Sequence, residues 1–430
     1  MNHPIGTSHR SSKTLFAGLS CKVCSVALLT NCGRDPLTAS NIADFIENNR
    51  PPEGTSTPAD GSATPAIGNA PTADPNQVNN QTEVNSVTPP ADDAVVPNLP
   101  AALFEYAAVT LPAHFRQGGR GGTVVAADNT PTDNPITNPG ATPGRVLFYD
   151  KQLSANNTVS CASCHQQSAG FADPVPLSTG FEGGLTGRRS MGLTNARFYD
   201  RGRFFWDERA ATLEDQVLIP IQDAVEMGMN LDDLVTKLSS TNYYGPLFED
   251  AFGSRTVTSE RISRSLAQFV RSMVSFQSKY DAAFVNGNPD FRNVLTAEED
   301  RGRRIFDQNC ANCHETNGQI SDQPRNTGLD AVTTDEGAGR GRFKSPSLRN
   351  IAVRAPYMHD GRFETLREVV NFYNTGIQRN PNLDNRLRAR GGAPRRMNLD
   401  ANEINALITF IEALTDNTFL TDPKFSNPFE

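Results

Sequence analysis

Two five-residue strings in this chain have the residue types and the spacing needed to bind an iron porphyrin covalently. CASCH begins at residue 161 and CANCH begins at residue 310. Two thiols at this spacing can add to both vinyl groups of one porphyrin, and the histidine that follows is then held where its imidazole reaches the iron. The pattern therefore predicts two haem c groups. Their attachment and iron-ligand residues are Cys161, Cys164 and His165 for the first haem, and Cys310, Cys313 and His314 for the second.

A zinc site built from the two CxxC pairs is the alternative for these cysteines, but it leaves the histidine after each pair unexplained. The other three cysteines are Cys21, Cys24 and Cys32. No disulfide framework is left to build from them. A redox-active pair of Cys21 and Cys24 is the weaker interpretation, because both lie inside an apolar N-terminal run.

The elements that must position the two strings are expected to be helices. RVLFYDKQLSANNTVSCASCH and RRIFDQNCANCH each place an arginine and an aromatic-containing helix just before the haem string, which indicates a weak internal repeat. Capping-box patterns begin at Thr212, Thr296 and Thr365. Two further segments have apolar residues at helical spacing. They contain Leu366, Val369, Val370 and Tyr373, and Ile404, Leu407, Ile408, Ile411 and Leu414.

Composition divides the chain into four segments. Residues 1–32 carry basic residues and then an interrupted apolar run, typical of an export signal and too short to span a bilayer as a mature helix. Residues 33–100 are rich in Pro, Ala, Thr and Asn, and we expect a disordered tether there. We predict an all-α fold with long loops, in which residues 101–292 form an N-terminal haem c domain and residues 293–430 a C-terminal haem c domain.

The export signal predicts a periplasmic protein. The residues before Cys32 resemble a lipoprotein processing site, but Asn31 stands where a small residue is usual. The sequence therefore leaves open whether Cys32 carries a lipid anchor. A net charge of −8 and a pI near 5.4 argue against a general nucleic-acid binder, because binding to phosphates needs a basic surface.

Longer strings resemble the bacterial di-haem cytochrome c peroxidase family, including its MauG-like branch. GRVLFYDKQLSANNTVSCASCH, FFWDERAATLEDQVLIPIQDAVEM, CANCH and SPSLRNIAVRAPYMHDGRFETLREVVNFY follow in one consistent order between residues 100 and 420. The resemblance implies an enzyme that uses hydrogen peroxide, with the first haem as the peroxide-reactive one. It also implies that Trp206, the only tryptophan of the chain, lies between the haems.

The resemblance assigns further roles around the first haem. Glu226 corresponds to a glutamate that works over the open face of this haem, Gln216 to a glutamine that holds peroxide or a water, and Pro220 to the proline between them. A carboxylate in a semi-apolar pocket can take a proton from the inner oxygen of peroxide and return it to the outer one. Glu226 is the residue expected to do so.

Two departures from the conventional family pattern favour the MauG-like branch. Conventional members often place a histidine sixteen residues after the first axial histidine, where it caps the first haem; here Phe181 stands there and cannot ligate iron. Conventional members supply a methionine fourteen residues after the histidine of a PYxH motif; counted from His359, this position is Tyr373. We expect an open first haem, Tyr373 on the second iron, and oxidising equivalents that both haems and Trp206 share.

Such an enzyme can oxidise a docked partner protein at a distance, and in the MauG branch the targets include tryptophan residues of a partner. Two alternatives stay open. One is a conventional peroxidase that takes electrons from a small cytochrome or cupredoxin, and Phe181 and Tyr373 argue against it. The other is an electron-transfer cytochrome without turnover, which has no use for Glu226.

Calcium is the least certain cofactor. The family holds calcium between its domains with an asparagine and with carbonyls beside the PYxH motif, which correspond here to those of Arg354 and Pro356. Arg189 stands at the asparagine position. We expect its guanidinium to replace part of the charge of the cation. Glu208, where the family pattern FWDGR has glycine, has no explanation in the sequence.

Overall fold

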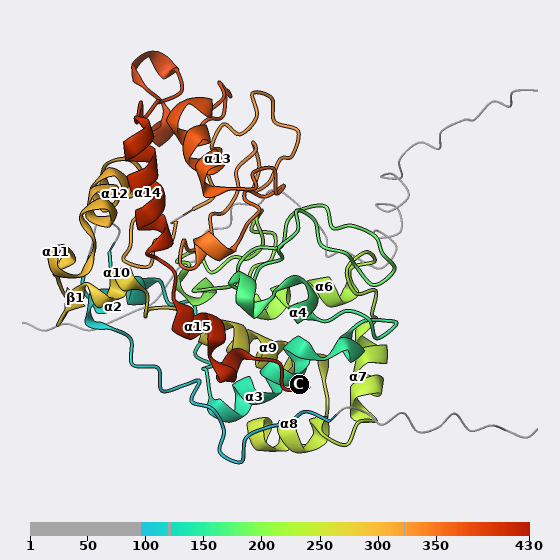
Figure 1. Ribbon diagram of the computed structural model, residues 1–430. Helices are drawn as coiled ribbons and strands as arrows, with labels where there is room; N and C mark the ends of the chain where they lie inside the picture. Colours follow the sequence, from blue (N-terminus) through green and yellow to red (C-terminus); the bar gives the residue numbers. More distant parts are fainter. Residues whose placement is uncertain (1–95, 119–121, 322) are drawn as a thin grey trace, which may run out of the picture. The chain divides into compact units, whose positions relative to one another are not determined.

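Helices joined by long loops carry the two haem strings, which confirms the all-α prediction (Figure 1). The computed structural model describes residues 96–430 except 119–121 and 322. The predicted export signal, Cys21, Cys24, Cys32 and nearly all of the predicted tether lie outside these residues. All the described residues belong to one compact unit, Val87–Glu430.

The helices alternate with loops and short 3-10 turns, and a single antiparallel hairpin occurs within the described residues. The hairpin consists of β1 (Phe284–Val285) and β2 (Asn288–Pro289). The α-helices are α2 (Ala113–Arg116), α3 (Asn138–Tyr149), α4 (Cys161–Cys164), α5 (Leu213–Gln216), α6 (Ile219–Gln222), α7 (Leu231–Ser239), α8 (Tyr244–Phe252), α9 (Ser259–Ser272), α10 (Lys279–Ala282), α11 (Phe291–Val294), α12 (Ala297–Asn309), α13 (Leu366–Asn371), α14 (Ala401–Glu412) and α15 (Asn417–Thr421).

Each haem string follows one helix of a closely packed pair. The first pair is α3 with α9 and the second is α12 with α14, which lie side by side in Figure 1. A Cβ atom on Gly144 would lie 2.0 Å from the carbonyl oxygen of Ser265, and one on Gly302 would lie 1.9 Å from that of Ala406. Only glycine allows either helix pair to approach this closely. The two glycines occupy equivalent positions in the two copies of the weak internal repeat, so the repeat is also present in the structure.

Two of the three predicted capping boxes are present in full. Thr296 opens α12 and Thr365 opens α13, each with the reciprocal bond from the glutamate three residues later. Thr212 opens α5 and accepts from the backbone N–H of Asp215, but this carboxylate accepts from the Thr212 hydroxyl and not from its N–H. The third pattern is therefore only half a capping box, and α5 is a single turn.

The end of the chain returns to the first helix pair. Phe419 and Phe425 are buried in the same apolar cluster as α3 and α9, and Figure 1 shows α15, in red, near both helices. The hydroxyl of Tyr149 donates to the carbonyl of Phe425 at 2.5 Å, and Nε of Arg145 donates to that of Ser426 at 2.7 Å. The last residues thus complete the core around the first haem string.

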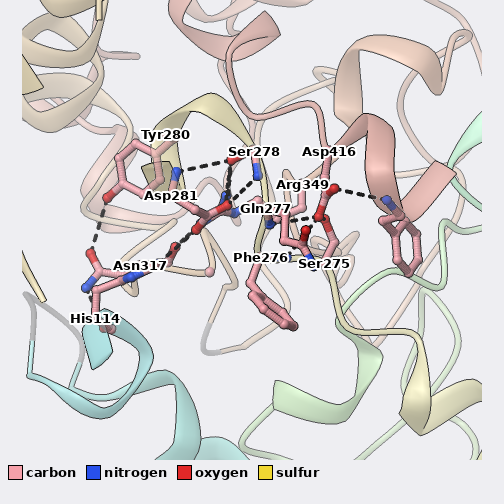
Figure 2. A network of polar contacts seen from close by, with 12 residues as sticks. His114, Ser275, Phe276, Gln277, Ser278, Tyr280, Asp281, Asn317, Arg349 and Asp416 are labelled. Carbon is pink, nitrogen blue, oxygen red and sulfur yellow. Dashed lines mark hydrogen bonds and ion pairs between the residues drawn. The ribbon is translucent and has the colours of Figure 1, made fainter. Parts of the chain in front are cut away.

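A buried polar network ties the N-terminal segment to the loop that follows the second haem string (Figure 2). Asp281 on α10 accepts from Nη2 of Arg349 at 2.7 Å and lies 2.8 Å from Nε2 of His114. Arg349 also donates to the carbonyl of Asn317 at 2.6 Å, and the Asn317 amide donates to the carbonyl of His114 at 2.8 Å. Since Asn317 is three residues after His314, the network fixes the loop behind that histidine.

The point where the chain crosses back is also held by a buried carboxylate. Asp416 accepts from the hydroxyl of Ser275 at 2.9 Å and from the backbone N–H of Gln277 at 2.8 Å (Figure 2). Its own N–H donates to Asn350 at 2.7 Å. These bonds join the entrance of α15 to the segment between α9 and α10.

Candidate functional site

The first haem string is folded for an axial histidine. Cys161 and Cys164 begin and end α4, and His165 follows directly. The Nδ1 atom of His165 lies 2.9 Å from the carbonyl oxygen of Phe171, so it carries the proton and leaves Nε2 as the ligand atom. Burial lowers the pKa of His165, which favours the neutral imidazole that a metal needs.

The second haem string lines a large cavity. Cys310, Cys313 and His314 lie on its wall, and the other side chains around it are mostly apolar. Burial raises the pKa of Cys310 to about 12 and lowers that of His314 to about 4. Protonated thiols, a neutral imidazole and apolar walls fit a covalently attached haem.

The zinc alternative loses its basis in the arrangement of the cysteines. Cys161 and Cys164 follow α3, which packs against α9, whereas Cys310 and Cys313 follow α12, which packs against α14. Among residues 96–430 as described, no group of three or more His, Cys, Asp and Glu side chains could hold a metal ion. Each cysteine pair serves its own site.

Tyr373 lines the cavity of the second string, but it does not lie on an α-helix. The prediction of helical periodicity through residue 373 is wrong after Asn371, where α13 ends and a π-helical turn, η6 (Phe372–Gly376), begins. Such wider turns are often found at functional sites because they redirect a side chain. Burial raises the pKa of Tyr373, so a phenolate there needs a cation beside it.

The same cavity also holds sulfur donors that the sequence analysis did not consider. Met358 and Met397 both line it. Met358 belongs to the PYxH motif itself and has a left-handed backbone with φ of +73°. The methionine within that motif was a signal visible in the sequence, and it makes Met358 an alternative to Tyr373 as a ligand of the second iron.

His359 lies beside the cavity of the second string and not in it. It lines an adjoining, more polar pocket, whose wall Trp206 and Tyr373 share with the haem cavity. The imidazole stacks on Phe343 with ring centroids 3.6 Å apart. Hydrogen bonds from Arg188 hold the pKa of the nearby Asp335 at about 2, so a full negative charge faces this pocket.

Trp206 links the two haem sites through short contacts. Its ring lines the cavity of the second string. Its indole N–H donates to the carbonyl of Arg189 at 2.7 Å, and the next residue, Ser190, places its hydroxyl 3.1 Å from Nδ1 of His165. Trp206 therefore lines the site of the second haem string. It is also bonded to Arg189, whose neighbour Ser190 contacts His165 of the first string. Ser190 was missed because no spacing in the sequence relates it to His165.

The loop that holds Trp206 also explains Glu208. Glu208 is buried, accepts a hydrogen bond from the Tyr199 hydroxyl, and accepts from Nε and Nη2 of Arg201 at 2.8 and 2.9 Å. Both Glu208 (φ +56°) and Phe205 (φ +70°) have left-handed backbones, a region that disfavours side chains. The structure holds Trp206 between two strained residues.

Lys344 packs under this loop and was also missed by sequence reasoning. Its backbone N–H donates to the carbonyl of Trp206 at 2.8 Å, and its ammonium donates to the carbonyl of Arg203 at 2.8 Å. The ammonium lies 3.9 Å from the centre of the Tyr199 ring. Burial lowers the pKa of Lys344 to about 7, which the sequence gave no means of anticipating.

Glu226 and the first haem string come together in the structure. Burial, and then the charge of Asp223, raise the pKa of Glu226. Burial is the largest cause that raises the pKa of Cys161 and Cys164, and the charge of Glu226 adds to it. The chain before the string also contacts the Glu226 segment, since the N–H of Ala155 donates to the carbonyl of Met227 at 2.9 Å. A carboxyl group with a raised pKa beside a haem attachment site is suited to proton transfer.

Phe181 lies next to Glu226. Its N–H donates to the carbonyl of Glu226 at 3.0 Å, and its ring packs against the backbone of Gly228. Gln216 ends α5, and Pro220 lies in the first turn of α6; both are half-buried. No contact in the described part of the chain joins the side chain of either residue to Glu226, so the structure brings Phe181 to the site but leaves the role of Gln216 a prediction.

Arg189 places a positive charge at a carbonyl that the resemblance offers to calcium. Its Nη2 atom donates to the carbonyls of Arg354 and Asp173, both at 2.7 Å. The guanidinium of Arg354 donates to the carbonyl of Ser347 at 2.9 Å. Within the described chain, neither arginine forms an ion pair, and Nε of each has no partner.

In the described residues, no helix has the length and apolar character needed to cross a bilayer. Comparison with protein families finds a match to di-haem cytochrome c peroxidase over residues 139–290 and a match to cytochrome c over residues 299–415.

Individual relatives cover most of the chain. The methylamine utilization protein MauG of Methylophilus methylotrophus is 31% identical over 296 residues, which are 66% of this chain and 84% of that protein. The cytochrome c551 peroxidase of Nitrosomonas europaea is 30% identical over 305 residues, 66% of this chain and 81% of that one. A solved structure, a MauG-like protein associated with microbial copper homeostasis, matches with 32% identity and a TM-score of 0.61, covering 70% of this chain and 96% of the other.

Proposed function

The chain belongs to the di-haem cytochrome c peroxidase family, and on that premise we propose that it draws oxidising equivalents from hydrogen peroxide at an open first haem, shares them with the second haem through Trp206, and oxidises a partner protein at long range. As a member of this family the protein is a haem peroxidase. The long-range, MauG-like mode is the part that we add.

The two haem c groups, when bound, supply the redox-active irons at which peroxide is reduced. Glu226 moves the proton. With the haem bound, its carboxylate would accept a proton from one oxygen of peroxide and return it to the other, so that water can leave. Its raised pKa brings the acid form closer to neutral pH, so that the same group can act as base and then as acid.

The position of Trp206 is the observation that carries the proposal. Its ring is on the wall of the second cavity, and its indole N–H is bonded to the residue that precedes Ser190, the neighbour of His165. A single aromatic ring between two redox sites shortens the path for an electron between them. The lone tryptophan of the chain is thus placed to share charge.

Two further features support the MauG-like mode over a conventional peroxidase. Phe181 contacts the Glu226 segment and has no atom that can ligate iron. Tyr373 lines the second cavity, and a tyrosinate is a hard anionic ligand that favours ferric and higher oxidation states. We propose that the first iron stays open to peroxide and that Tyr373 ligates the second.

Spectroscopy of the oxidised protein tests this proposal. The fully oxidised, diferric protein is mixed with one equivalent of peroxide and followed by optical, near-infrared and Mössbauer spectroscopy. We expect rapid oxidation of both irons, and loss of the shared state in Trp206→Phe. A response only after one haem has been reduced would assign a conventional peroxidase, and no response in any redox state would assign an electron carrier.

Two smaller proposals concern the surroundings of the enzyme. We propose that the Arg189 guanidinium takes the place of part of the charge of a calcium ion, because it donates to the carbonyl of Arg354. We also propose that residues 1–32 export the protein to the periplasm. Measurement of bound calcium by atomic emission and cell fractionation of the full-length chain test the two.

A further inference from the structure

Glu208 needs an explanation that packing alone does not give. It is a buried carboxylate at a left-handed backbone position, where a glycine would be relaxed. Such a position disfavours a residue with a side chain. Glu208 lies two residues after Trp206, and its carboxylate accepts a hydrogen bond from the hydroxyl of Tyr199.

Tyr199 has the surroundings of a tyrosine that can lose an electron and a proton together. Its side chain is buried, with an exposed fraction of 1%, and its hydroxyl donates to Oε1 of Glu208. A buried phenol can be oxidised at moderate potential only when a base accepts its proton, because the cationic radical is a strong acid. Glu208 is such a base in direct contact.

Lys344 connects this pair to Trp206. Its backbone N–H is bonded to the carbonyl of Trp206, and its ammonium lies over the Tyr199 ring. A charged ammonium there opposes loss of an electron from the ring. Because burial lowers the pKa of Lys344 to about 7, a large fraction of this side chain is neutral near neutral pH.

We infer that Tyr199 is a redox-active residue that reduces oxidised Trp206, with Glu208 as its proton acceptor. One electron passes from the Tyr199 ring to the Trp206 radical cation, which returns to the neutral indole. At the same time the O–H bond of Tyr199 breaks and its proton forms an O–H bond with the carboxylate of Glu208. The products are a neutral tyrosyl radical, a neutral carboxylic acid and Trp206 in its resting form.

The inference rests on the proposed function for its oxidant, which peroxide supplies, and it extends the path of charge towards the surface. Arg201, the other partner of Glu208, has a side chain that is 45% exposed. The pair therefore lies directly beneath residues that a docked protein can touch. A substrate that meets this loop would give its electron to Tyr199 and not to a haem edge.

The rival explanation is that Tyr199, Glu208 and Arg201 only clasp the loop. The chain offers a matched control for it in Tyr244, which is also fully buried and donates to a carboxylate, Oδ2 of Asp150, at 2.7 Å. None of the contacts described for Tyr244 reaches Trp206 or Lys344. If these residues only hold the loop, Tyr199 carries no unpaired spin. If Tyr199 and Glu208 are a redox pair, Tyr199 carries the unpaired spin and Tyr244 does not.

Electron paramagnetic resonance of the freeze-quenched holoenzyme tests the inference. Protein with ring-deuterated tyrosine is oxidised either with peroxide or with photogenerated tris(bipyridine)ruthenium(III). We expect a radical signal that deuteration narrows, that is lost in Tyr199→Phe and in Glu208→Gln, and that persists in Tyr244→Phe. The melting temperature and haem absorbance of each variant verify that it folds. The narrowing by deuteration is measured on the unmutated protein, so it does not depend on the folding of a variant.

Persistence of the signal in Tyr199→Phe, its loss in Tyr244→Phe alone, or no tyrosyl signal with either oxidant would overturn the inference. The two oxidants separate it from the proposed function. Peroxide that oxidises both irons without a tyrosyl radical from either oxidant leaves the proposed function standing and removes Tyr199. A Tyr199 radical from the ruthenium oxidant, in a protein that does not react with peroxide, supports the role of Tyr199 and overturns the proposed function.

Discussion

Glu226 is the residue on which peroxide chemistry depends most directly, through its carboxyl group. We expect Glu226→Gln to lower the rate constant for reaction with peroxide by about 10²- to 10⁴-fold, since positioned acid–base catalysis is worth that much. Stopped-flow absorbance measures it. Glu182→Gln removes an exposed carboxylate next to Phe181 and should leave the rate unchanged.

The raised pKa of Glu226 also predicts a pH dependence. The base form is the carboxylate, so reactivity is full above the pKa and falls as the pH drops through it. Because burial raises this pKa above its usual value of 4.5, the fall occurs at higher pH than for an ordinary glutamate. A rate against pH that stays flat down to the ordinary carboxyl range would contradict the role of Glu226.

Tyr373 and Met358 can be separated by substitution. If tyrosinate is the ligand, Tyr373→Phe changes the absorbance and lowers the stability of the ferric second haem, whereas Met358→Leu changes neither. Tyr373→Met should raise the reduction potential of this haem, because methionine is a softer and neutral ligand. Spectroelectrochemical titration reads both, and a spectrum that changes only in Met358→Leu would give the site to the methionine.

At the scale of elements, the network around Asp281 joins α10 to the loop after the second haem string. Burial alone would raise the pKa of Asp281, but Arg349, His114 and Ser278 lower it overall. Asp281→Ala leaves the fully buried Arg349 without its carboxylate, and we expect a loss of about 3–5 kcal/mol in the free energy of unfolding. Arg255→Ala breaks an exposed pair and should cost about 1 kcal/mol or less.

The sign of the pH effect follows from the lowered pKa. The carboxylate is favoured by the folded state, so its contribution to stability is complete above the ordinary value of 3.8 and is lost as the pH falls through the folded-state pKa. Urea unfolding at neutral pH and below pH 4 checks it. An Asp281→Ala variant should show a smaller loss of stability over that range.

The elements also show what the sequence could and could not predict. The helices after Thr296 and Thr365 follow from caps and periodicity, which are local. The π-helical turn at Phe372 does not, because the α-helical period continues through Tyr373 and only the packing around the cavity widens the turn. Glu208 could not be explained either, since Tyr199 and Arg201 contact it through a loop whose backbone angles no propensity predicts.

For the whole molecule, the return of the chain to the first helix pair is the main feature that sequence patterns did not reveal. Phe425→Ala removes a fully buried ring from the core behind α3, and we expect it to cost about 3–5 kcal/mol. Urea unfolding followed by circular dichroism measures the loss. Val332→Ala, on a side chain that is 72% exposed, is the control and should change little.

The haem strings, the repeat and the family were predictable because each depends on residues close together in the sequence. The links between the two halves were not. Trp206 to Lys344, Asp281 to Arg349 and Phe425 to α3 join positions that only the folded chain brings together. A single sequence contains no local signal for such pairs.

The direction of synthesis gives the returning segment a further consequence. A ribosome makes Cys161 and Cys164 long before it makes Phe419 and Phe425, yet these two rings complete the core behind the first haem string. The core behind the first haem string is therefore incomplete on the nascent chain until these two rings have been made.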